Sequence, residues 1–240
     1  MKLSIITINY NNLEGLKRTY DSVVSQTCQD FEWIIIDGGS TDGSREFIEE
    51  RQDMFACWCS EPDKGIYNAM NKGIAKAKGE YLNFMNSGDC FYDEHTLEYF
   101  YREYTLSHNI AVFYGNADFY DDNGTLFIHM VLPDRIDAQF YSNGHNISHQ
   151  SSFIKSSILK EHLYDESYKL AADGDFFFWL LLRHYNFKHI NKVLIRSDVP
   201  GLSSNIELAR KEVARFLREN TQALPIRYKI WNKIVSWIHV

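Results

Sequence analysis

The feature that most constrains the fold is a regular alternation of apolar runs and helical patterns through the first half of the chain. The stretch from Ile66 to Ala77 places apolar residues at spacings of four, four and three, which is typical of one helix face. Strands that alternate with helices through short loops form a parallel sheet with right-handed crossovers. Such sheets bind ligands outside the carboxyl ends of their strands. The apolar runs predict buried strands at 3–9, 33–37, 54–59 and 80–86.

The second half of the sequence is less regular. Two predicted strands, 113–120 and 126–131, flank the turn from Asp121 to Gly124, which is a hairpin signal. The run from Asp173 to Tyr185 is apolar nearly all round, so we expect a buried helix there. Further strands are expected at 151–154 and 187–196, and helices at 206–224 and from Pro225.

Composition and charge exclude several classes of protein. The 240 residues carry a formal net charge of -7, which argues against nucleic-acid binding but leaves room for a local phosphate site. The longest apolar run, Phe176 to Leu182, is far shorter than the roughly 20 residues that span a bilayer. The N-terminus does not resemble a signal peptide, so we expect a cytoplasmic protein. The 4 cysteines form no CxxC pair, and we expect free buried thiols, with a disulfide or a metal site as the alternative.

Each of the first four predicted strands is followed by a cluster of polar residues. Alone, such a cluster is compatible with a turn or a helix cap, and Asn11 or Asn12 could cap the first helix. However, Tyr10 offers a ring for stacking on a base, and Gly38 and Gly39 let a ligand approach the backbone. Because the carboxyl ends of parallel strands share one edge, the four clusters together indicate a site for a polar, phosphorylated ligand.

The later clusters also carry charges suited to such a ligand. Lys64 and Lys72 are candidate partners for a phosphate or a carboxylate. Asp89 lies in a tight loop with Asn86, and a hard cation such as Mg²⁺ or Mn²⁺ is held by one or two carboxylates plus substrate phosphates. A helix expected to begin near Thr41 would aim its amides at the same edge.

Four segments, in this order and spacing, resemble the GT-A-type family 2 glycosyltransferases. They are SIITINYNN (4–12), IIIDGGSTDGS (34–44), DKGIYNAMNKG (63–73) and NSGD (86–89). The greatest similarity is to short bacterial enzymes of polysaccharide and lipopolysaccharide assembly. The resemblance implies a GT-A fold, a Rossmann-like α/β domain with a mostly parallel central sheet flanked by helices. That domain would span 1–204, with a nucleotide-sugar-binding half (1–90), an acceptor-binding half (91–204) and a C-terminal helical extension (205–240).

The same resemblance implies a donor site and a metal ligand. The implied donor-binding residues are Thr7, Asn9, Tyr10, Asp37, Gly39, Asp63, Gly65, Asn71, Lys72 and Ser87. Those of the first two clusters would line the base and ribose of a nucleotide-sugar, and the loop around Asp63 and Gly65 would lie over it. Met70 stands where an arginine is common in this family. Asp89 would bind a divalent cation, Mn²⁺ or Mg²⁺, although the motif has a single acid.

On the acceptor side, the resemblance implies that Asp173 is the catalytic base at the start of a buried helix. Asp175 is the competing candidate, and Asp173 could also simply cap that helix. His149 and Ser203 lie in segments that resemble family loops near the diphosphate or the acceptor. The QxxRW motif of processive synthases is absent, which favours transfer of one sugar per acceptor.

The expected function is therefore inverting transfer of a sugar, by a hexosyltransferase of surface polysaccharide or lipopolysaccharide synthesis. The expected donor is a UDP-sugar, and the expected acceptor is a saccharide or a lipid-linked saccharide. A nucleotidyltransferase and an inactive nucleotide-sugar-binding relative are the alternatives. A Rossmann oxidoreductase is disfavoured, because NYNNLEG (9–15) follows the first strand in place of GxGxxG.

The C-terminal segment 226–240 contains three basic residues, no acids and two tryptophans. One interpretation is a last helix that packs on the domain or on a second subunit in a homodimer. The other is an interfacial helix that rests on anionic lipid at the inner face of the cell membrane.

Overall fold

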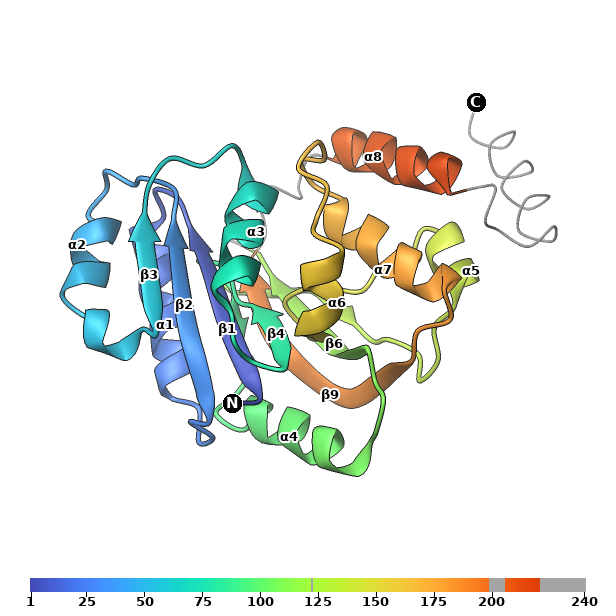
Figure 1. The fold of residues 1–240 in the computed structure, drawn as a ribbon, viewed down its shortest axis with the longest axis horizontal. Helices are drawn as coiled ribbons and strands as arrows, with labels where there is room; N and C mark the ends of the chain where they lie inside the picture. The colour runs from blue at the N-terminus through green and yellow to red at the C-terminus, as the bar shows by residue number, and fades with distance from the viewer. Residues whose placement is uncertain (122, 199–205, 221–240) are drawn as a thin grey trace.

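The computed structural model describes residues 1–121, 123–198 and 206–220, which form one nine-stranded sheet with helices on both faces (Figure 1). The strands are β1 (Leu3–Asn9), β2 (Phe31–Asp37), β3 (Cys57–Ser60), β4 (Tyr81–Phe84), β5 (Cys90–Phe91), β6 (Val112–Tyr120), β7 (Leu126–Met130), β8 (Ser152–Lys155) and β9 (Phe187–Asp198). The helices are α1 (Leu13–Val24), α2 (Ser44–Glu49), α3 (Ile66–Lys76), α4 (Thr96–Leu106), α5 (Ala138–Ser142), α6 (Ser156–Glu161), α7 (Ala172–Leu182) and α8 (Ile206–Glu219).

The strand order is β3-β2-β1-β4-β8-β6-β9-β5, and β7 pairs with β6 outside this path. The first four strands in that order pair in parallel, which confirms the predicted α/β sheet. In the β1–β2 pairing Asn9 lies opposite Asp37, so the first two polar clusters meet at one edge. Beyond β4 the sheet is mixed, because β8 runs antiparallel to both β4 and β6.

Helices cover both faces of the sheet and divide the core into two clusters. On one face α3, α5, α6 and α7 bury side chains such as Met70, Ile74 and Phe177. On the other face α1, α2 and α4 bury Leu16 and Phe100 against the sheet. Because side chains alternate along a strand, odd and even positions of β1 enter different clusters. Helix α7 is buried nearly all round, as its sequence predicted.

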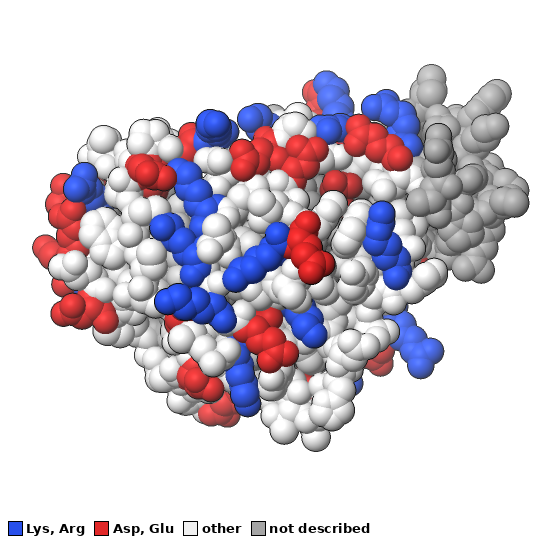
Figure 2. Space-filling view, viewed as in Figure 1, with Lys and Arg blue, Asp and Glu red and all other residues white. Residues whose placement is uncertain are grey.

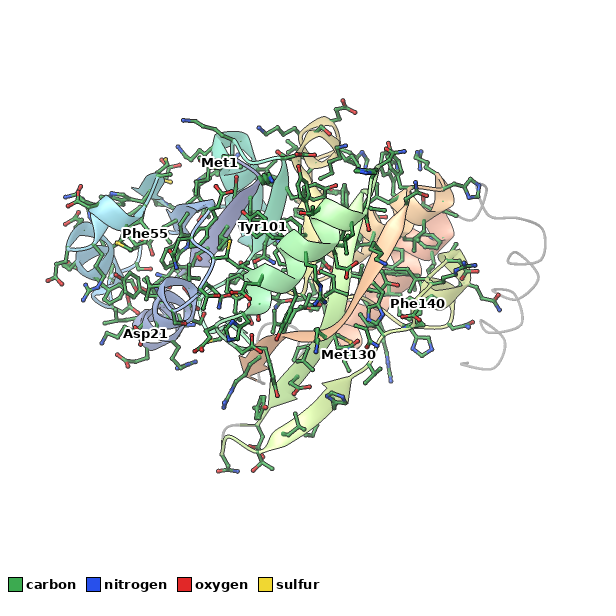
Figure 3. The ribbon with its side chains drawn as sticks, turned by 90° about the horizontal axis from the view of Figure 1, so that it is seen from below. Met1, Asp21, Phe55, Tyr101, Met130 and Phe140 are labelled. Carbon is green, nitrogen blue, oxygen red and sulfur yellow. The ribbon has the colours of Figure 1, made fainter. Side chains whose placement is uncertain are left out.

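Two predicted elements begin later than the sequence predicted. A 3₁₀ turn occupies Gln52–Met54, and β3 starts only at Cys57, because Met54 is half exposed and does not enter the core. Helix α2 starts at Ser44 rather than near Thr41, since Gly43 adopts a left-handed conformation (φ 95°) at its N-cap. The predicted hairpin is present, and Figure 3 shows it projecting from the body with Met130 near its base.

Charges are mixed over the face that α3 and α6 form. Figure 2 shows Lys and Arg side chains interspersed with Asp and Glu there, so the net negative charge does not make this face uniformly acidic. The 4 cysteines form no disulfide in the described part of the chain, and they are half-buried rather than fully buried as expected. Within the described ranges, no helix is both long and apolar enough to cross a bilayer.

Helix α8 lies against α7 rather than apart from the domain (Figure 1). The ring of Phe216 is buried, and its centroid lies 5.6 Å from that of Phe178 on α7. The described part of the chain stops at residue 220, one position after this helix ends. The predictions for Ser203 and for residues 225–240 lie outside the described residues.

Candidate active site

A cavity of about 820 Å³ opens where the predicted polar clusters meet. It is lined by Ile8, Asn9, Tyr10, Asn12, Gly38, Pro62, Asp63, Gly65, Ile66, Ala69, Asn86, Ser87, Lys169, Leu170 and Leu208. The carboxyl end of β1, the loops that follow β2, β3 and β4, and the first residues of α3 therefore form most of its wall. This is the edge at which the sequence predicted a ligand.

Asp37 lies behind the cavity wall and holds Asn9, Ser40 and Ser60 by hydrogen bonds. Its carboxylate is fully buried and accepts hydrogen bonds from Asn9 Nδ2 (2.7 Å), Ser40 Oγ (2.5 Å) and Ser60 Oγ (2.6 Å). Burial alone would raise the pKa of Asp37, but these hydrogen bonds outweigh burial and lower it. Asp37 is not among the lining residues, and neither is Gly39 beside it. The carboxylate therefore fixes Asn9, which does line the cavity.

Tyr10 faces the cavity with 67% of its surface exposed. Its ring lies over Gly38, because a Cβ on that glycine would sit 3.0 Å from Tyr10 Cδ2 and 3.2 Å from Asp63 Oδ2. A side chain at this position would narrow the space between ring and carboxylate. Thr7 does not reach the cavity. Its side chain is fully buried in the core, where it accepts a hydrogen bond from Trp33 Nε1 (2.9 Å). The structure thus brings Tyr10 to the cavity and leaves Thr7 in the core.

The third cluster divides in a similar way. Asp63 and Gly65 line the cavity, whereas Lys72 lies behind them and contacts Asp63 Oδ1 (2.6 Å) and Glu61 Oε1 (2.8 Å). Burial would lower the pKa of Lys72, but its hydrogen bonds to these carboxylates raise it. Asn71 is buried. Its Nδ2 donates to the carbonyl oxygen of Tyr164, and its Oδ1 accepts from the amide of Tyr164. Lys72 therefore holds the loop around Asp63, and Asn71 holds α3 against the segment at Tyr164. Neither side chain lines the cavity.

The structure places Met70 in the core and not at the cavity. Its side chain is fully buried in the core between α3 and the sheet. A residue at this position points away from the cavity, so a nucleotide contact would have to come from elsewhere in the chain.

The fourth cluster forms a tight turn in which Asp89 N donates to Asn86 O (2.9 Å). Ser87 Oγ donates to Asn9 Oδ1 (2.7 Å), which joins this turn to the first cluster. The carboxylate of Asp89 accepts from Ser197 Oγ (2.5 Å) and Gln150 Nε2 (3.1 Å). Asp89 is buried and lies behind the lining residues.

This turn supplies the oxygen ligands that a hard cation prefers. Asn86 Oδ1 is buried and has no hydrogen-bond partner among the described residues, although Asn86 lines the cavity. Ser197 and Gln150, which donate to Asp89, are both neutral groups. Mg²⁺ and Mn²⁺ use one or two protein carboxylates and complete their shell with water and phosphate oxygens. Among the described residues, no group of three or more His, Cys, Asp or Glu side chains is placed to hold a metal ion. The carboxylate of Asp89 and the unpartnered Oδ1 of Asn86 are the oxygen atoms of this turn that could contribute to such a shell.

Asp173 lies at the start of α7 and is joined to the cavity wall through His149. Asp173 Oδ2 is 2.7 Å from His149 Nδ1, and His149 Nε2 is 3.1 Å from Asn86 Nδ2. Tyr67 Oη donates to the other carboxylate oxygen (3.2 Å). Burial would lower the pKa of His149, but the hydrogen bond and charge of Asp173 raise it. A buried carboxylate, an imidazole and a cavity-lining amide thus form one chain of contacts.

Asp173 does not act as the N-cap of α7. The N-cap residue is Ala171, which has no side-chain cap, and Asp173 lies in the first turn, where Oδ1 accepts from Gly174 N (2.9 Å). Asp175, the competing candidate, faces the end of α8, and Asn220 Nδ2, one position after this helix, donates to it (3.4 Å). Burial, together with the charges of nearby carboxylates, raises the pKa of Asp175 to about 6. It has no contact with His149 in the described structure.

Sequence reasoning missed three residues that shape this site. Lys169 and Leu208 line the cavity, and Glu212 of α8 accepts hydrogen bonds from backbone amides just before α7. Lys169 precedes the predicted base by four positions, which is the one signal that the sequence carries for it. Nothing in the sequence marks Glu212, because an amphipathic helix has charged residues at many positions.

The fold and the cavity together define a class of nucleotide-sugar enzymes, the GT-A glycosyltransferases. The structure matches residues 1–349 of S. aureus TarS in complex with UDP-GlcNAc (TM-score 0.71, 18% identity), covering 93% of this chain and 70% of that one. It also matches a mannosyltransferase of Pyrobaculum calidifontis in complex with GDP-Man and Mn²⁺ (TM-score 0.62, 13% identity), covering 99% and 80% of the two chains. At sequence identities of 18% and 13%, the structural similarity establishes the fold alone.

The family follows from the sequence match. The model of glycosyl transferase family 2 matches residues 4–163, and the chain belongs to this family. An uncharacterised glycosyltransferase of Mycobacterium tuberculosis is 34% identical over 183 residues, covering 72% of this chain and 66% of the relative. A PGL/p-HBAD biosynthesis glycosyltransferase of Mycobacterium bovis is 28% identical over 252 residues, covering 97% and 92%. The expected GT-A fold and family 2 membership are both confirmed.

Proposed function

We propose that this protein is an inverting glycosyltransferase that moves one sugar from a nucleoside-diphosphate sugar to a hydroxyl acceptor. The observation that carries the proposal is the contact chain from Asp173 through His149 to Asn86 on the cavity wall. It links a buried carboxylate, suited to accept a proton, to a cavity large enough for a nucleotide-sugar. The GT-A fold of the chain supports the same assignment.

In this mechanism Asp173 takes the proton of the acceptor hydroxyl while that oxygen attacks the anomeric carbon. The attack is in line with the departing nucleoside diphosphate, through an oxocarbenium-like transition state. His149 orients Asp173 by donating from Nδ1, and Tyr67 donates to the second oxygen. These two hydrogen bonds leave the carboxylate in one fixed orientation, which lowers the cost of positioning it for proton transfer.

Asp89 and Asn86 are the residues that would hold a divalent cation, Mn²⁺ or Mg²⁺. When bound, the ion would supply Lewis-acid stabilisation of negative charge on the diphosphate. The mannosyltransferase that shares the fold is in complex with GDP-Man and Mn²⁺, which supports testing this ion first.

The donor side of the proposal rests on Tyr10, Asn9 and Ser87, which line the cavity together. The aromatic ring would stack on the base, and the amide and hydroxyl would bind polar groups of the ribose. We propose a UDP-sugar as donor, supported by the UDP-GlcNAc complex of S. aureus TarS. The proposed acceptor is a saccharide or a lipid-linked saccharide.

We propose that the protein acts in the cytoplasm at the inner face of the membrane, where a lipid-linked acceptor would be located. The sequence leaves two roles for residues 225–240: packing on the domain or on a second copy, or resting on anionic lipid. Co-sedimentation with anionic vesicles, of the full chain and of a variant lacking 225–240, distinguishes them. Equal sedimentation of the two proteins would exclude the lipid role, and sedimentation equilibrium would report a homodimer.

A donor screen tests the proposed function. UDP-, GDP- and dTDP-sugars are incubated with the protein and with Mn²⁺, Mg²⁺ or chelator, and the released nucleotide is identified. We expect release of a nucleoside diphosphate, whereas a nucleotidyltransferase reaction would release pyrophosphate. With an acceptor, NMR of the product reports the anomeric configuration, and retention would contradict the inverting mechanism. Absence of turnover with every donor would contradict the transferase assignment.

A further inference from the structure

Few charged side chains line the cavity that is proposed to bind the donor. Among its described lining residues, Lys169 is the only Lys or Arg and Asp63 is the only carboxylate. The charge of Asp63 is already balanced by Lys72, at 2.6 Å behind the wall. Lys169, in contrast, forms no ion pair with any described residue. Its ammonium group is therefore available to an anionic ligand.

The ammonium group of Lys169 lies close to Gly65, which also lines the cavity. A Cβ on Gly65 would lie 4.0 Å from Lys169 Nζ, so this ammonium group faces the backbone at the start of α3. Gly65 has a φ of 132°, a conformation that side chains rarely adopt. The backbone there stays bare, and the space between Gly65 and Lys169 remains open to a ligand.

Lys169 is held in place by a carboxylate of α8. Glu212 Oε1 accepts from Lys169 N (2.7 Å), and Glu212 Oε2 accepts from Leu170 N (2.8 Å) and Ala171 N (3.0 Å). The side chain of Glu212 is buried, with only 8% of its surface exposed. A buried carboxylate is costly unless it is hydrogen-bonded, and three amides satisfy this one. The three-residue segment 169–171 is thus fixed by one side chain.

The same segment leads directly into α7, whose N-cap residue is Ala171. Because Asp173 follows two positions later, Glu212 positions both the lysine at the cavity and the helix start that carries the proposed base. Leu208, one turn before Glu212 on α8, lines the cavity itself. Helix α8 lies beyond residues 4–163 that match the family model, so these features belong to a part of the chain that the match does not cover.

We propose that Lys169 binds the diphosphate of the donor and that Glu212 is the positioning residue that holds it at the cavity. This inference rests on the proposed function, since it assumes that a nucleoside diphosphate occupies the cavity. A lysine ammonium group is a natural partner for phosphate oxygens, and its charge would also stabilise the diphosphate as it leaves. Lys169 takes the role that the buried position of Met70 cannot fill.

Calorimetric titration of the full chain with UDP and GDP, and with uridine and guanosine, tests the proposal. We expect Lys169→Ala to weaken diphosphate binding by about 10-fold or more, because a hydrogen bond to a charged group contributes about 1.5–3 kcal/mol. Nucleoside binding should stay at the wild-type level, and Lys169→Arg should restore most of the diphosphate affinity. The Lys169 side chain is exposed, so its removal should leave the fold intact.

Glu212→Gln should also weaken binding of UDP and GDP without weakening nucleoside binding. In addition, hydrogen exchange at the amides of residues 169–171 should become faster. Matched controls are Glu207→Gln and Lys211→Ala, which disrupt an exposed ion pair on the same helix (2.6 Å) and should change neither measurement. Wild-type diphosphate affinity in Lys169→Ala, or an equal loss for nucleosides, would overturn the proposal. If the wild-type protein binds neither UDP nor GDP, the proposed function itself fails.

Discussion

His149 Nδ1 lies 2.7 Å from Asp173 Oδ2, although the two residues are separated by 24 positions and come from different elements. His149 precedes β8, and Asp173 lies in the first turn of α7. The other ring nitrogen of His149 reaches Asn86 on the cavity wall. Through His149, the proposed base is thus linked to the wall of the cavity that is proposed to bind the donor.

Asp173→Asn should lower kcat by about 10²–10⁴-fold, since this is the range that general-base catalysis contributes. Asparagine keeps the size of the side chain but cannot accept the proton. Binding of the nucleotide should be unchanged, because Asp173 is not among the residues that line the cavity. Initial rates and calorimetric titration with UDP or GDP measure the two effects separately.

Asp175→Asn is the matched control for that experiment. Asp175 is two positions away on the same helix, but it faces α8 and contacts Asn220. The kcat of the Asp175→Asn variant should stay near the wild-type value. A near-native rate in Asp173→Asn with a large loss in Asp175→Asn would reassign the base.

Tyr10→Ala should raise the KM for the donor by about 5- to 100-fold. Stacking of a base on an aromatic ring contributes about 1–3 kcal/mol, and this ring is exposed in the cavity. Tyr10→Phe keeps the ring and should retain most of the affinity. Comparable KM values for all three proteins would show that the base binds elsewhere.

Asp175 should make stability depend on pH. Its pKa rises from an ordinary 3.8 to about 6 on folding, so the folded state favours the protonated form. The resulting cost to stability appears as the pH rises from about 4 to about 6 and is fully present above that range. Asp175→Asn removes this cost.

We therefore expect Asp175→Asn to raise Tm by about 2–4 °C at pH 7.5, corresponding to about 1 kcal/mol after allowance for solvent screening. At pH 4 the two proteins should unfold at similar temperatures. Thermal unfolding by circular dichroism at both pH values makes the comparison. A stabilisation that is equal at pH 4 and pH 7.5 would refute the electrostatic explanation.

Removal of divalent cations with EDTA should lower the transfer rate, and added Mn²⁺ or Mg²⁺ should restore it. The reason is that Asp89 is a single acid, so a bound ion would depend on a few oxygen ligands and exchange readily. Asp89→Asn should raise the Mn²⁺ concentration needed for half-maximal rate. A wild-type rate that is insensitive to EDTA would contradict a metal role for Asp89.

Much of the fold could be predicted because its signals are local. Apolar runs such as 3–9 and helical spacing from Ile66 to Ala77 determine strands and helices, and their alternation determines a parallel sheet. Since every parallel strand ends at the same edge, the location of the cavity also followed. The weakest prediction was the strand at 54–59, where an exposed Met54 resembles a core residue in sequence alone.

Which side chains face the cavity depended on the tertiary structure. Thr7, Asp37 and Lys72 were predicted at the donor site, yet the first lies in the core and the other two hold the wall from behind. Strand register and the loops that close over a strand end decide which side of the wall a residue occupies. Those are long-range contacts, which the local pattern does not contain.

By itself, the sequence determined the α/β class, the edge that binds a ligand and the polar residues gathered there. Only the tertiary structure brought His149 to Asp173 and Glu212 to the amides of residues 169–171. Both contacts join segments more than 20 positions apart, and their distances depend on how α7 packs in the core and how α8 packs on α7. Packing is a collective property of the core, so no single stretch of the chain could specify it.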